Sequence, residues 1–442
     1  MSILLAVLAS LCSLTLLLLV DVVSLGVFGG LLGGSCFLTL AISLIQAKPS
    51  LLWMLPILVG FVWVGFSVVT LEIGFYAPEI DTLTYATGAS LRYFFLLEIF
   101  LWAAYFSFPD VRSLENLSEQ ENKRLVSAIV FFWIFLFIIL FANGLVYGFP
   151  VLSGEQRFNY WVDHPIGSWL PKLFSYSAYL WLCGGWVLSK SRPGYGRVLA
   201  LLAIFHIVFA VLYSNKASIF LVALFSFFAG YGVGRSSVRR KILSANQIVI
   251  LLFSLFSILV LTYFSYHFVH GYDMQDVFGV MLRRIFVMQG QLWWAIDNCV
   301  SLDCASVGSD GLFYKGDGVY GIFVLMKEVM PDRMFEYYFN NKVPLTGGFP
   351  ANLVFFSGFG GAILFCLLSG LLVGLFLRGL HVALCGHILM IFLYVFIYSS
   401  INWAFSLGSF NIFLNPLFIS VLSIIFFSHL FLFCARLNCE RA

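Results

Sequence analysis

The chain has 442 residues, of which 61% are apolar and only 10% are charged, and its formal net charge is +3. Soluble domains carry roughly 25% charged residues, so this composition excludes a soluble globular protein. Apolar runs near the bilayer-spanning length of about 20 residues recur along the chain. Since an open sheet cannot satisfy its backbone groups in lipid, we predict an all-α, polytopic integral membrane protein.

In chain order, the predicted elements begin with the run SILLAVLASLCSLTLLLLV. This run lacks a basic n-region and a clear small-residue cleavage site, so we interpret it as the first span rather than as a signal peptide. Some later runs are short or interrupted by glycine. Twelve spans are predicted, near residues 3–20, 23–46, 51–71, 89–108, 125–146, 169–189, 197–213, 217–234, 247–268, 350–378, 380–400 and 412–435.

Basic residues set the predicted orientation, because short cytoplasmic connections are enriched in Lys and Arg. One set of connections includes both termini and carries 14 basic residues, mostly in short loops. The other set carries ten, six of which lie in one long segment. We therefore expect both termini to be cytoplasmic and two segments to face outward, a first loop over residues 147–168 and a large loop over residues 270–349.

The first outward loop contains the stretch SGEQRFNYWVDHPIGSW, which concentrates ionisable groups in an otherwise apolar chain. Arg157 can bind phosphate through two parallel hydrogen bonds, or it can form a loop salt bridge with Glu155 or Asp163. His164 can act as a base at neutral pH, although its position before a proline fits a turn equally well.

The large outward loop is long and rich in aromatic residues, which indicates a functional, partly folded segment. Its stretch GVYGIFVLMKEVM, residues 318–330, fits a short amphipathic helix at the membrane surface. The stretch MLRRIFVMQGQLWWAID, residues 281–297, fits another helix. We expect a partly helical cap over the transmembrane bundle.

The second of these predicted helices carries two adjacent arginines. Arg283 and Arg284 point about 100° apart on a helix, so one can face a cavity while the other extends to lipid headgroups. Gln289 follows them, and glutamine amides suit the recognition of hydroxyl groups. Trp293 and Trp294 either offer stacking surfaces for sugar rings or form an interfacial aromatic belt.

Two more charges stand alone among apolar residues. Lys216, in YSNKASIF, lies at the outer end of two apolar runs, where it either meets a phosphate or is a plain hairpin charge. Glu98 lies inside a predicted span, where it either pairs with Arg92 or caps a polar interior. Isolated charges in membrane proteins are costly and usually functional.

Two of the nine cysteines lie in the large outward loop. Cys299 and Cys304 have four residues between them, and an oxidising outer compartment favours a disulfide. We predict one between these two residues. No histidine lies near the pair to complete a metal site, and the lack of an outward carboxylate cluster predicts no metal or other cofactor.

The distribution of chemistry along the chain is asymmetric. Outward loops and outer span ends carry arginines, a lysine, histidines and aromatic residues, whereas the inner side shows no Walker motif or other nucleotide-binding loop. The predicted ligand is therefore anionic, amphiphilic and reached from the outer leaflet. A polyprenyl-diphosphate-linked saccharide meets all three demands.

The chain resembles the O-antigen polymerases of the Wzy type, within the wider O-antigen ligase and polymerase superfamily. The resemblance covers nearly the whole chain as a layout of about twelve spans, inner termini and two outward loops. The motifs that carry it are, in chain order, GEQRFNYW, YSNKASIF, RRIFVMQGQ and GGFPANLVFFSGFGGAILF.

This resemblance implies a glycosyltransferase of the bacterial inner membrane. Such an enzyme joins oligosaccharide repeat units at the periplasmic face, and undecaprenyl diphosphate is the leaving group. Family members place arginines in both large outward loops. Arg157 matches the first loop, either Arg283 or Arg284 matches the start of the second, with Arg333 further on, and Lys216 stands where the family often has an arginine.

On this hypothesis Arg157 binds the diphosphate, and His164 or Asp163 assists the acceptor hydroxyl. The expected partners are undecaprenyl-diphosphate-linked oligosaccharide and membrane lipids, with no nucleic acid, and the sequence leaves open whether a chain-length regulator protein works beside the enzyme. Three alternatives remain. They are an O-antigen ligase that transfers polymer to lipid A core, another glycosyltransferase with a polyprenyl-linked donor, and a transporter, which predicts charges buried at mid-membrane.

Overall fold

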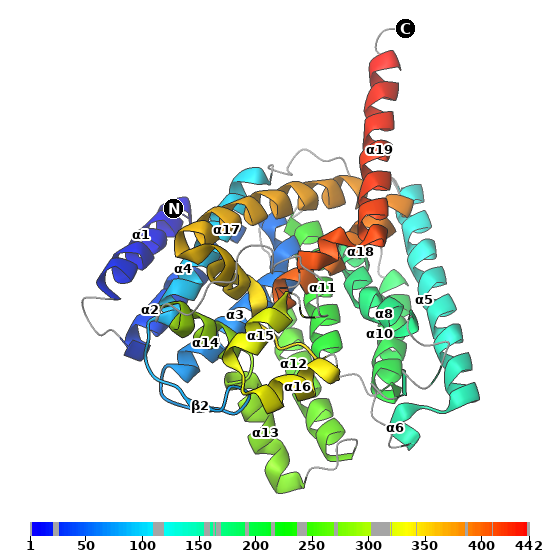
Figure 1. Cartoon of the computed structure of the whole chain (residues 1–442). Coiled ribbons are helices and arrows are strands. Elements are labelled where there is room, and N and C mark those ends of the chain that lie inside the picture. The colour runs from blue at the N-terminus through cyan, green and yellow to red at the C-terminus, as the bar shows by residue number, and fades with distance from the viewer. Residues whose placement is uncertain are drawn as a thin grey trace.

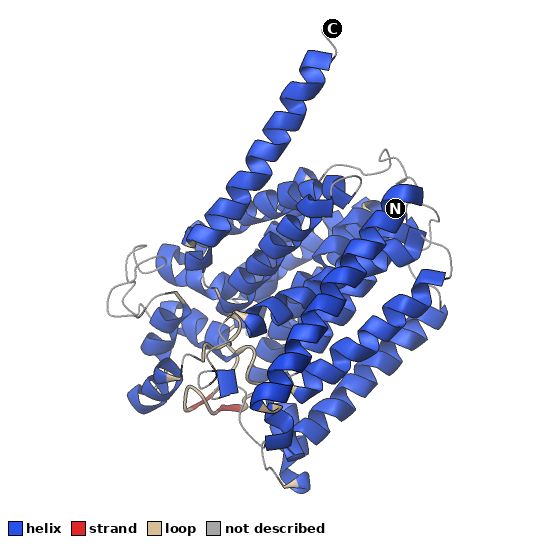
Figure 2. Ribbon diagram, turned by 90° about the vertical axis from the view of Figure 1, so that its right-hand side faces the viewer, coloured by secondary structure: helices blue, strands red, loops and turns tan. Residues whose placement is uncertain are grey.

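Long apolar helices dominate the structure, a computed structural model (Figures 1 and 2). One pair of short strands is present among the residues that the structure describes. These residues are 2–20, 26–108, 119–153, 160–161, 164, 169–190, 194–213, 217–236, 245–268, 273–301, 319, 321–341, 343–384, 388–408 and 410–439.

The elements follow one another along the chain with short connections. The α-helices are α1 (Ser2–Val20), α2 (Gly26–Ala47), α3 (Leu55–Leu71), α4 (Ala89–Ser107), α5 (Glu119–Tyr147), α6 (Pro150–Ser153), α8 (Leu170–Ser177), α9 (Trp181–Lys190), α10 (Gly194–Leu212), α11 (Ala217–Ser236), α12 (Ala245–Phe268), α13 (Met274–Phe286), α14 (Gln291–Ser301), α15 (Ile322–Val329), α16 (Asp332–Asn340), α17 (Gly348–Leu384), α18 (Ile388–Leu407) and α19 (Pro416–Cys439). The 3-10 helices are η1 (Pro49–Met54), η3 (Ala178–Leu180) and η5 (Phe410–Leu414), and the strands are β1 (Tyr76–Ala77) and β2 (Thr82–Leu83).

Nine helical segments of the described chain are long and apolar enough to cross a membrane. They are Ser2–Leu19, Val27–Ala47, Pro49–Leu71, Ala89–Ser107, Lys123–Ser153, Tyr195–Leu212, Ser218–Arg235, Gly348–Leu384 and Met390–Leu407. A helix satisfies its own backbone hydrogen bonds, which lipid requires. The chain is therefore an all-α, multi-pass membrane protein, which confirms the predicted class.

The helix α17 shows how a long apolar run is accommodated. A straight helix of 37 residues would extend about 55 Å, well beyond a hydrocarbon core of about 30 Å. Non-helical backbone at Gly358, with φ 68°, interrupts the run, and Figure 1 shows the resulting bend. The sequence placed the division between two spans near residue 379, inside what is the second part of α17.

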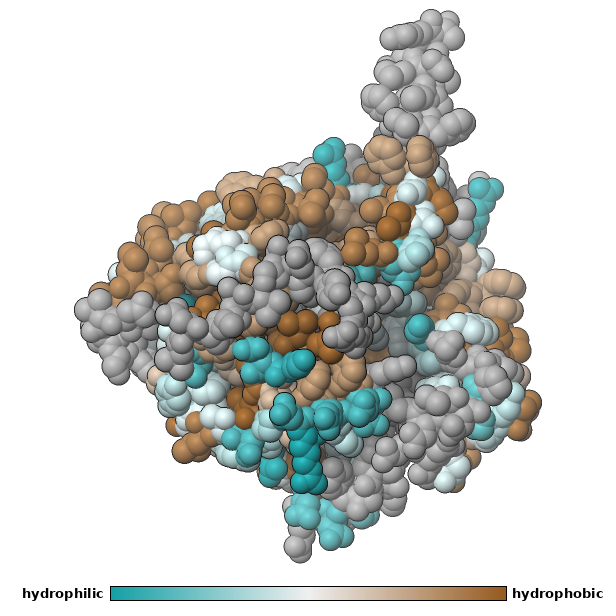
Figure 3. Space-filling model, in the orientation of Figure 1, coloured by the Kyte–Doolittle hydropathy of each residue, from teal (hydrophilic) through white to brown (hydrophobic). Residues whose placement is uncertain are grey.

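One end of the bundle carries a polar layer, which we call the end layer. It consists of the connection 72–88, which holds β1 and β2, together with α13, α14, α15 and α16. The strands pair antiparallel, with Tyr76 opposite Leu83. Hydrophilic residues gather over α13 and α16 in Figure 3, whereas most of the surrounding surface is apolar. The helix predicted over residues 281–297 is in fact two helices, α13 and α14, while α15 lies inside the amphipathic stretch predicted over residues 318–330.

The opposite end of the bundle is closed by a different contact. Figures 1 and 2 place the start of α1 and the end of α19 toward this end. Lys48 Nζ donates to the carbonyl oxygens of Tyr105 and Phe108, both at 2.7 Å. A lysine at the C-terminus of a helix satisfies its last carbonyls and complements the helix dipole, so Lys48 fixes the end of α4.

Candidate functional site

The residues predicted from the first outward loop lie mostly outside the described chain, as do Arg157, Asp163, Lys216 and Cys304. His164 is described. Its ring stacks on Tyr147, with 4.7 Å between the ring centroids, and meets the ring of Tyr160 at 4.5 Å. Tyr160 donates to the carbonyl oxygen of Gly148 at 2.8 Å. His164 thus belongs to an aromatic group at the end of α5.

The candidates from the large loop lie at the junction of α13 and α14, which is fastened to α3. Trp63 Nε1 donates to the carbonyl oxygen of Ile285 at 2.8 Å. Ser67 Oγ donates to the carbonyl oxygen of Val287 and accepts from the backbone N–H of Gly290, both at 2.8 Å. A Cβ at Gly290 would lie 2.6 Å from a backbone nitrogen of α3. The junction is therefore held close against a membrane-spanning helix.

The two adjacent arginines of α13 differ in their surroundings. Arg283 is exposed, whereas Arg284 is half-buried. The guanidinium carbon of Arg284 lies 5.3 Å from the ring centroid of Tyr266 on α12, a cation–π distance. The structure shows no salt bridge between either arginine and a described residue. Arg284 therefore faces the interior of the end layer with its charge not paired to a carboxylate there.

A buried carboxyl group, Glu79, lies on the turn between β1 and β2. Its Oε1 accepts from the hydroxyl of Tyr338 at 2.6 Å, and Gln291 Nε2 donates to its Oε2 at 3.4 Å. The backbone N–H of Glu79 donates to Gln291 Oε1 at 3.1 Å. Burial raises the pKa of Glu79, while the Tyr338 hydrogen bond and the charge of Arg284 act to lower it. These contacts draw α13, α14, α16 and the connection 72–88 together.

Gln289 extends the same set of contacts. Its Nε2 donates to the carbonyl oxygen of Arg284 at 3.4 Å, and its Oε1 accepts from the hydroxyl of Thr346. We call the six residues Glu79, Arg284, Gln289, Gln291, Tyr338 and Thr346 the Arg284 group. The group combines a guanidinium, which binds phosphate or carboxylate, with hydroxyl and amide groups that suit a polyol. Arg333 is exposed on α16 and contributes no described contact to it.

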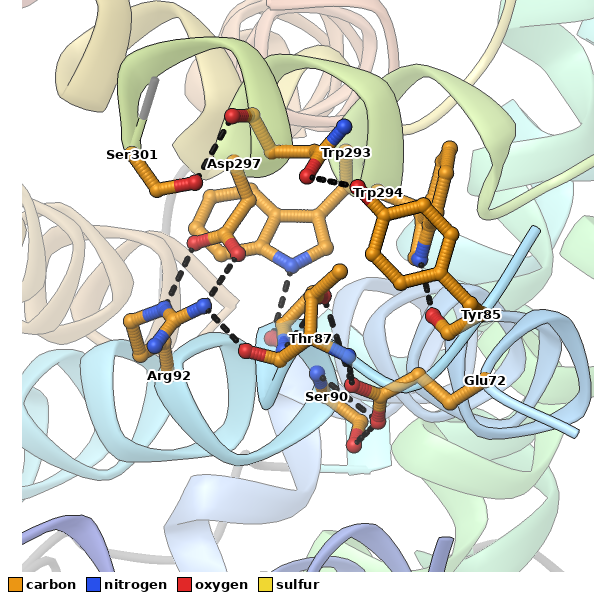
Figure 4. Close-up of polar contacts among 11 residues, drawn as sticks. Glu72, Tyr85, Thr87, Ser90, Arg92, Trp293, Trp294, Asp297 and Ser301 are labelled. Atoms are coloured by element: carbon orange, nitrogen blue, oxygen red, sulfur yellow. Dashed lines mark hydrogen bonds and ion pairs between the residues drawn. The ribbon is translucent and has the colours of Figure 1, made fainter. Parts of the chain in front are cut away.

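A second polar group lies nearby in the end layer and is drawn in Figure 4. Arg92, in the first turn of α4, grips Asp297 on α14 through two hydrogen bonds, Nε to Oδ1 at 2.8 Å and Nη2 to Oδ2 at 2.7 Å. Nη2 also donates to the carbonyl oxygen of Thr87 at 2.7 Å. Such a bidentate pair is strong and geometrically specific. We call Arg92, Asp297 and Thr87 the Arg92 clamp.

The sequence left two possible partners for Glu98, and the structure distinguishes them. Arg92 pairs with Asp297, and Ser13 Oγ donates to Glu98 Oε1 at 2.6 Å. Positions six apart on a helix do not share a face, so the expected pairing of Glu98 with Arg92 is wrong. The other expectation, that Glu98 caps a polar interior, is met by the contact with α1.

Glu72 holds the start of α4 beside the clamp. Its Oε1 accepts from the backbone N–H of Thr87 at 3.1 Å, and its Oε2 accepts from the backbone N–H of Ser90 at 3.4 Å and from the Ser90 hydroxyl. A carboxylate at a helix N-terminus satisfies unpaired N–H groups and complements the dipole. Burial raises the pKa of Glu72, and these donors act to lower it.

The two tryptophans of α14 are packing residues. Trp293 is 0% exposed and Trp294 is 2% exposed. Their indole nitrogens donate to the carbonyl oxygens of Ala89 at 2.8 Å and Tyr85 at 3.0 Å (Figure 4). Neither ring is available for stacking on a sugar or for an interfacial belt, so both expectations for this pair are wrong.

The cysteine prediction is met in part by the described residues. Cys299, near the end of α14, is disulfide-bonded. Its predicted partner, Cys304, is outside the described chain.

Two members of the Arg284 group were not found by sequence reasoning. Glu79 lies in a short connection, in the stretch YAPEID, and its partner Tyr338 is 259 positions away. Tyr338 stood out only as one of several aromatic residues of the large loop. The available signal for Glu79 was a lone carboxylate in a chain where 10% of residues are charged.

Comparison with known proteins gives one match. A family of unknown function (DUF6418) matches residues 315–427. This stretch includes α15 to α18 and therefore Tyr338 and Thr346 of the Arg284 group. No curated protein and no solved structure matches the chain.

Proposed function

We propose that the protein is a membrane glycosyltransferase of the O-antigen polymerase kind. It joins undecaprenyl-diphosphate-linked oligosaccharide repeat units at the periplasmic face of the bacterial inner membrane and releases undecaprenyl diphosphate. In this proposal the chain has twelve spans and cytoplasmic termini, and the end layer is the periplasmic cap.

The observation that carries the proposal is the half-buried guanidinium of Arg284 among hydroxyl and amide groups at the end of an apolar bundle. A lipid-linked saccharide needs these three elements side by side. Its polyprenyl tail requires apolar helices, its diphosphate requires a cation, and its sugars require hydrogen-bonding side chains such as Gln289.

The proposed chemistry is transfer of a growing chain to a new acceptor. A hydroxyl oxygen of the acceptor sugar attacks the anomeric carbon of the donor, and the bond from that carbon to the diphosphate oxygen breaks. Negative charge then grows on the leaving diphosphate. Arg284 stabilises that charge in the transition state through two parallel hydrogen bonds. In the first loop Arg157 supplies the second cation, and Lys216 contributes a third.

The disulfide at Cys299 supports the assignment of the end layer to the periplasm. Disulfides persist in oxidising compartments such as the periplasm and are rare in the cytosol. A ligase that transfers polymer to lipid A core would share this layout and differ in its acceptor.

Transport of a lipid-linked saccharide is the second candidate, favoured by Glu98. This carboxyl lies near the middle of α4 and is 2% exposed, and its Oε2 has no hydrogen-bond partner among the described residues. Ionisable residues inside a membrane commonly mark transport pathways. The substitution Glu98→Gln removes the ionisable group at nearly the same volume and therefore tests this alternative.

The test is deletion of the gene in its native host, followed by gel analysis of the surface polysaccharide. The polymerase proposal predicts a collapse of the ladder to core plus one repeat unit. Wild type restores the ladder, Arg284→Ala does not, and Arg197→Ala, a change of an exposed arginine on α10, does. Lipid-linked polymer that accumulates without transfer to core indicates the ligase. An unchanged ladder rejects both enzymes, and a ladder lost in Glu98→Gln but kept in Arg284→Ala supports transport.

A further inference from the structure

The hydroxyl of Tyr338 lies between a buried carboxyl group and the surface of the end layer. Glu79 is 3% exposed, whereas Tyr338 is only half-buried on α16. The two oxygen atoms are 2.6 Å apart, and the phenol donates its proton to Glu79 Oε1. A phenol oxygen that donates one hydrogen bond can still accept another. A hydroxyl group arriving from outside can therefore contact Tyr338 but not Glu79 itself.

This arrangement distinguishes Glu79 from the two other buried carboxyl groups of the end layer. Both oxygens of Asp297 are held by Arg92. Both oxygens of Glu72 accept from the start of α4. Of the three, Glu79 is the one held by a hydroxyl group that reaches toward the surface.

The surroundings of Glu79 suit a proton acceptor. The titratable and charged groups that act on it are Tyr338 from α16 and Arg284 from α13, while α14 contributes the neutral amide of Gln291. Burial raises the pKa of Glu79 above its ordinary value. A carboxylate whose pKa is moved toward the working pH is a better general base than an ordinary one.

We propose that Tyr338 and Glu79 form a proton relay that deprotonates the acceptor sugar hydroxyl, which deepens and rests on the proposed polymerase function. As the hydroxyl oxygen bonds to the anomeric carbon of the donor, its proton passes to the Tyr338 oxygen. The Tyr338 proton passes at the same time to Glu79 Oε1. The bond between the anomeric carbon and the diphosphate oxygen breaks, and the diphosphate leaves with the electron pair beside Arg284. Tyr338 is the catalytic residue that touches substrate, and Glu79 acts through it.

The test uses the full chain in lipid nanodiscs. The substrate is lipid-linked oligosaccharide extracted from the native host lacking this gene. Chain extension is measured over a range of pH for wild type, Tyr338→Phe, Glu79→Gln and the double variant. Tyr337→Phe is the matched control, because Tyr337 carries the same hydroxyl on the neighbouring residue and is 65% exposed. Thermal midpoints in detergent identify any variant that fails to fold, and Glu79→Gln keeps an oxygen for the Tyr338 hydroxyl.

The relay predicts a loss of about 100-fold or more in kcat for Tyr338→Phe and for Glu79→Gln, the range of general acid–base catalysis, with little change in KM. Wild-type activity falls as the pH drops through the pKa of Glu79, and this fall disappears in Glu79→Gln. The double variant loses about as much as either single variant, because the two residues act as a unit.

Two results would overturn the relay while leaving the polymerase intact. One is extension by Tyr338→Phe within about tenfold of wild type, well below the expected contribution. The other is an unchanged pH profile in Glu79→Gln. If wild type itself extends no chain, the proposed function fails and the relay fails with it.

Discussion

Arg92 and Arg284 lie in the same layer of the molecule and are placed in opposite ways. Arg92 spends its guanidinium on Asp297 and on a helix-end carbonyl. Arg284 lies against the ring of Tyr266 and makes no salt bridge with a described residue. A completed bidentate pair fixes structure, whereas a half-buried guanidinium without a carboxylate can receive an anion. The difference shows which of two chemically identical side chains is suited to bind a ligand.

The contrast extends to the neighbouring carboxyl groups. Asp297 meets Arg92 directly, but Glu79 is held by Tyr338 and Gln291, so Arg284 reaches it only through its electric field. Its pKa is therefore raised by burial more than it is lowered by the arginine. The predictions that follow separate the structural group from the functional one, beginning with the largest expected effect.

Breaking the Arg92 clamp should destabilise the protein most. Asp297→Ala leaves the Arg92 charge in a largely buried position, and loss of one partner of a buried pair costs about 3–5 kcal/mol. We expect a lower thermal midpoint in detergent and less protein in the membrane. Asp332→Ala, which removes an exposed carboxylate from α16, is the control. An Asp297→Ala protein with a wild-type midpoint would show that the clamp is not structural.

Removing Arg284 should affect activity rather than stability. We expect Arg284→Ala to lower the rate of chain extension by about 10²–10³, comparable to loss of a donor that stabilises a developing oxyanion. The thermal midpoint should stay near that of wild type. Arg284→Lys should recover part of the rate, because it keeps the charge but loses the planar fork. Equal losses of folded protein in Arg284→Ala and Asp297→Ala would remove the distinction between the two arginines.

Loss of the Glu72 cap should have a smaller structural effect. Glu72→Ala removes the acceptor for the N–H groups at the start of α4, and an N-terminal cap contributes about 1 kcal/mol. Since α4 also carries Arg92, we expect a modest fall in thermal midpoint with activity retained per folded molecule. A midpoint that does not move would mean that water or another donor replaces the cap.

The smallest expected effect is a dependence of stability on pH. Burial raises the pKa of Glu72 and of Glu79 above the ordinary value of 4.5. Their contribution to stability is thus complete below that value and is lost as the pH rises through the raised values. We expect the thermal midpoint to fall over this window, and the double variant Glu72→Gln, Glu79→Gln to show a flatter profile. A midpoint that rises with pH only when both carboxyl groups are present would contradict this account.

The sequence predicts the membrane class well because span-length apolar runs leave few other structures possible. It also indicates the arginines of α13, since charges stand out in a chain that is 61% apolar. It does not reveal that Arg284, rather than Arg283, faces inward. That choice depends on the break between α13 and α14, which Ser67 on a distant helix holds in place.

The carboxyl partners were beyond the reach of sequence reasoning for a related reason. Asp297 is 205 positions from Arg92, and Glu79 is 259 positions from Tyr338. Neither separation has a local pattern that would suggest a contact. The buried positions of Trp293 and Trp294 have the same origin, because an aromatic pair on a short helix reads alike whether it faces lipid, sugar or the start of α4.

The central claim is that the protein extends a lipid-linked saccharide. The most direct measurement incubates the purified full chain, in nanodiscs, with lipid-linked oligosaccharide from the deletion strain, and follows both chain length and free undecaprenyl diphosphate. The account predicts a ladder of products and one undecaprenyl diphosphate released for each repeat unit added. Donor that stays intact with no longer chains, under conditions where the protein is folded, would contradict it.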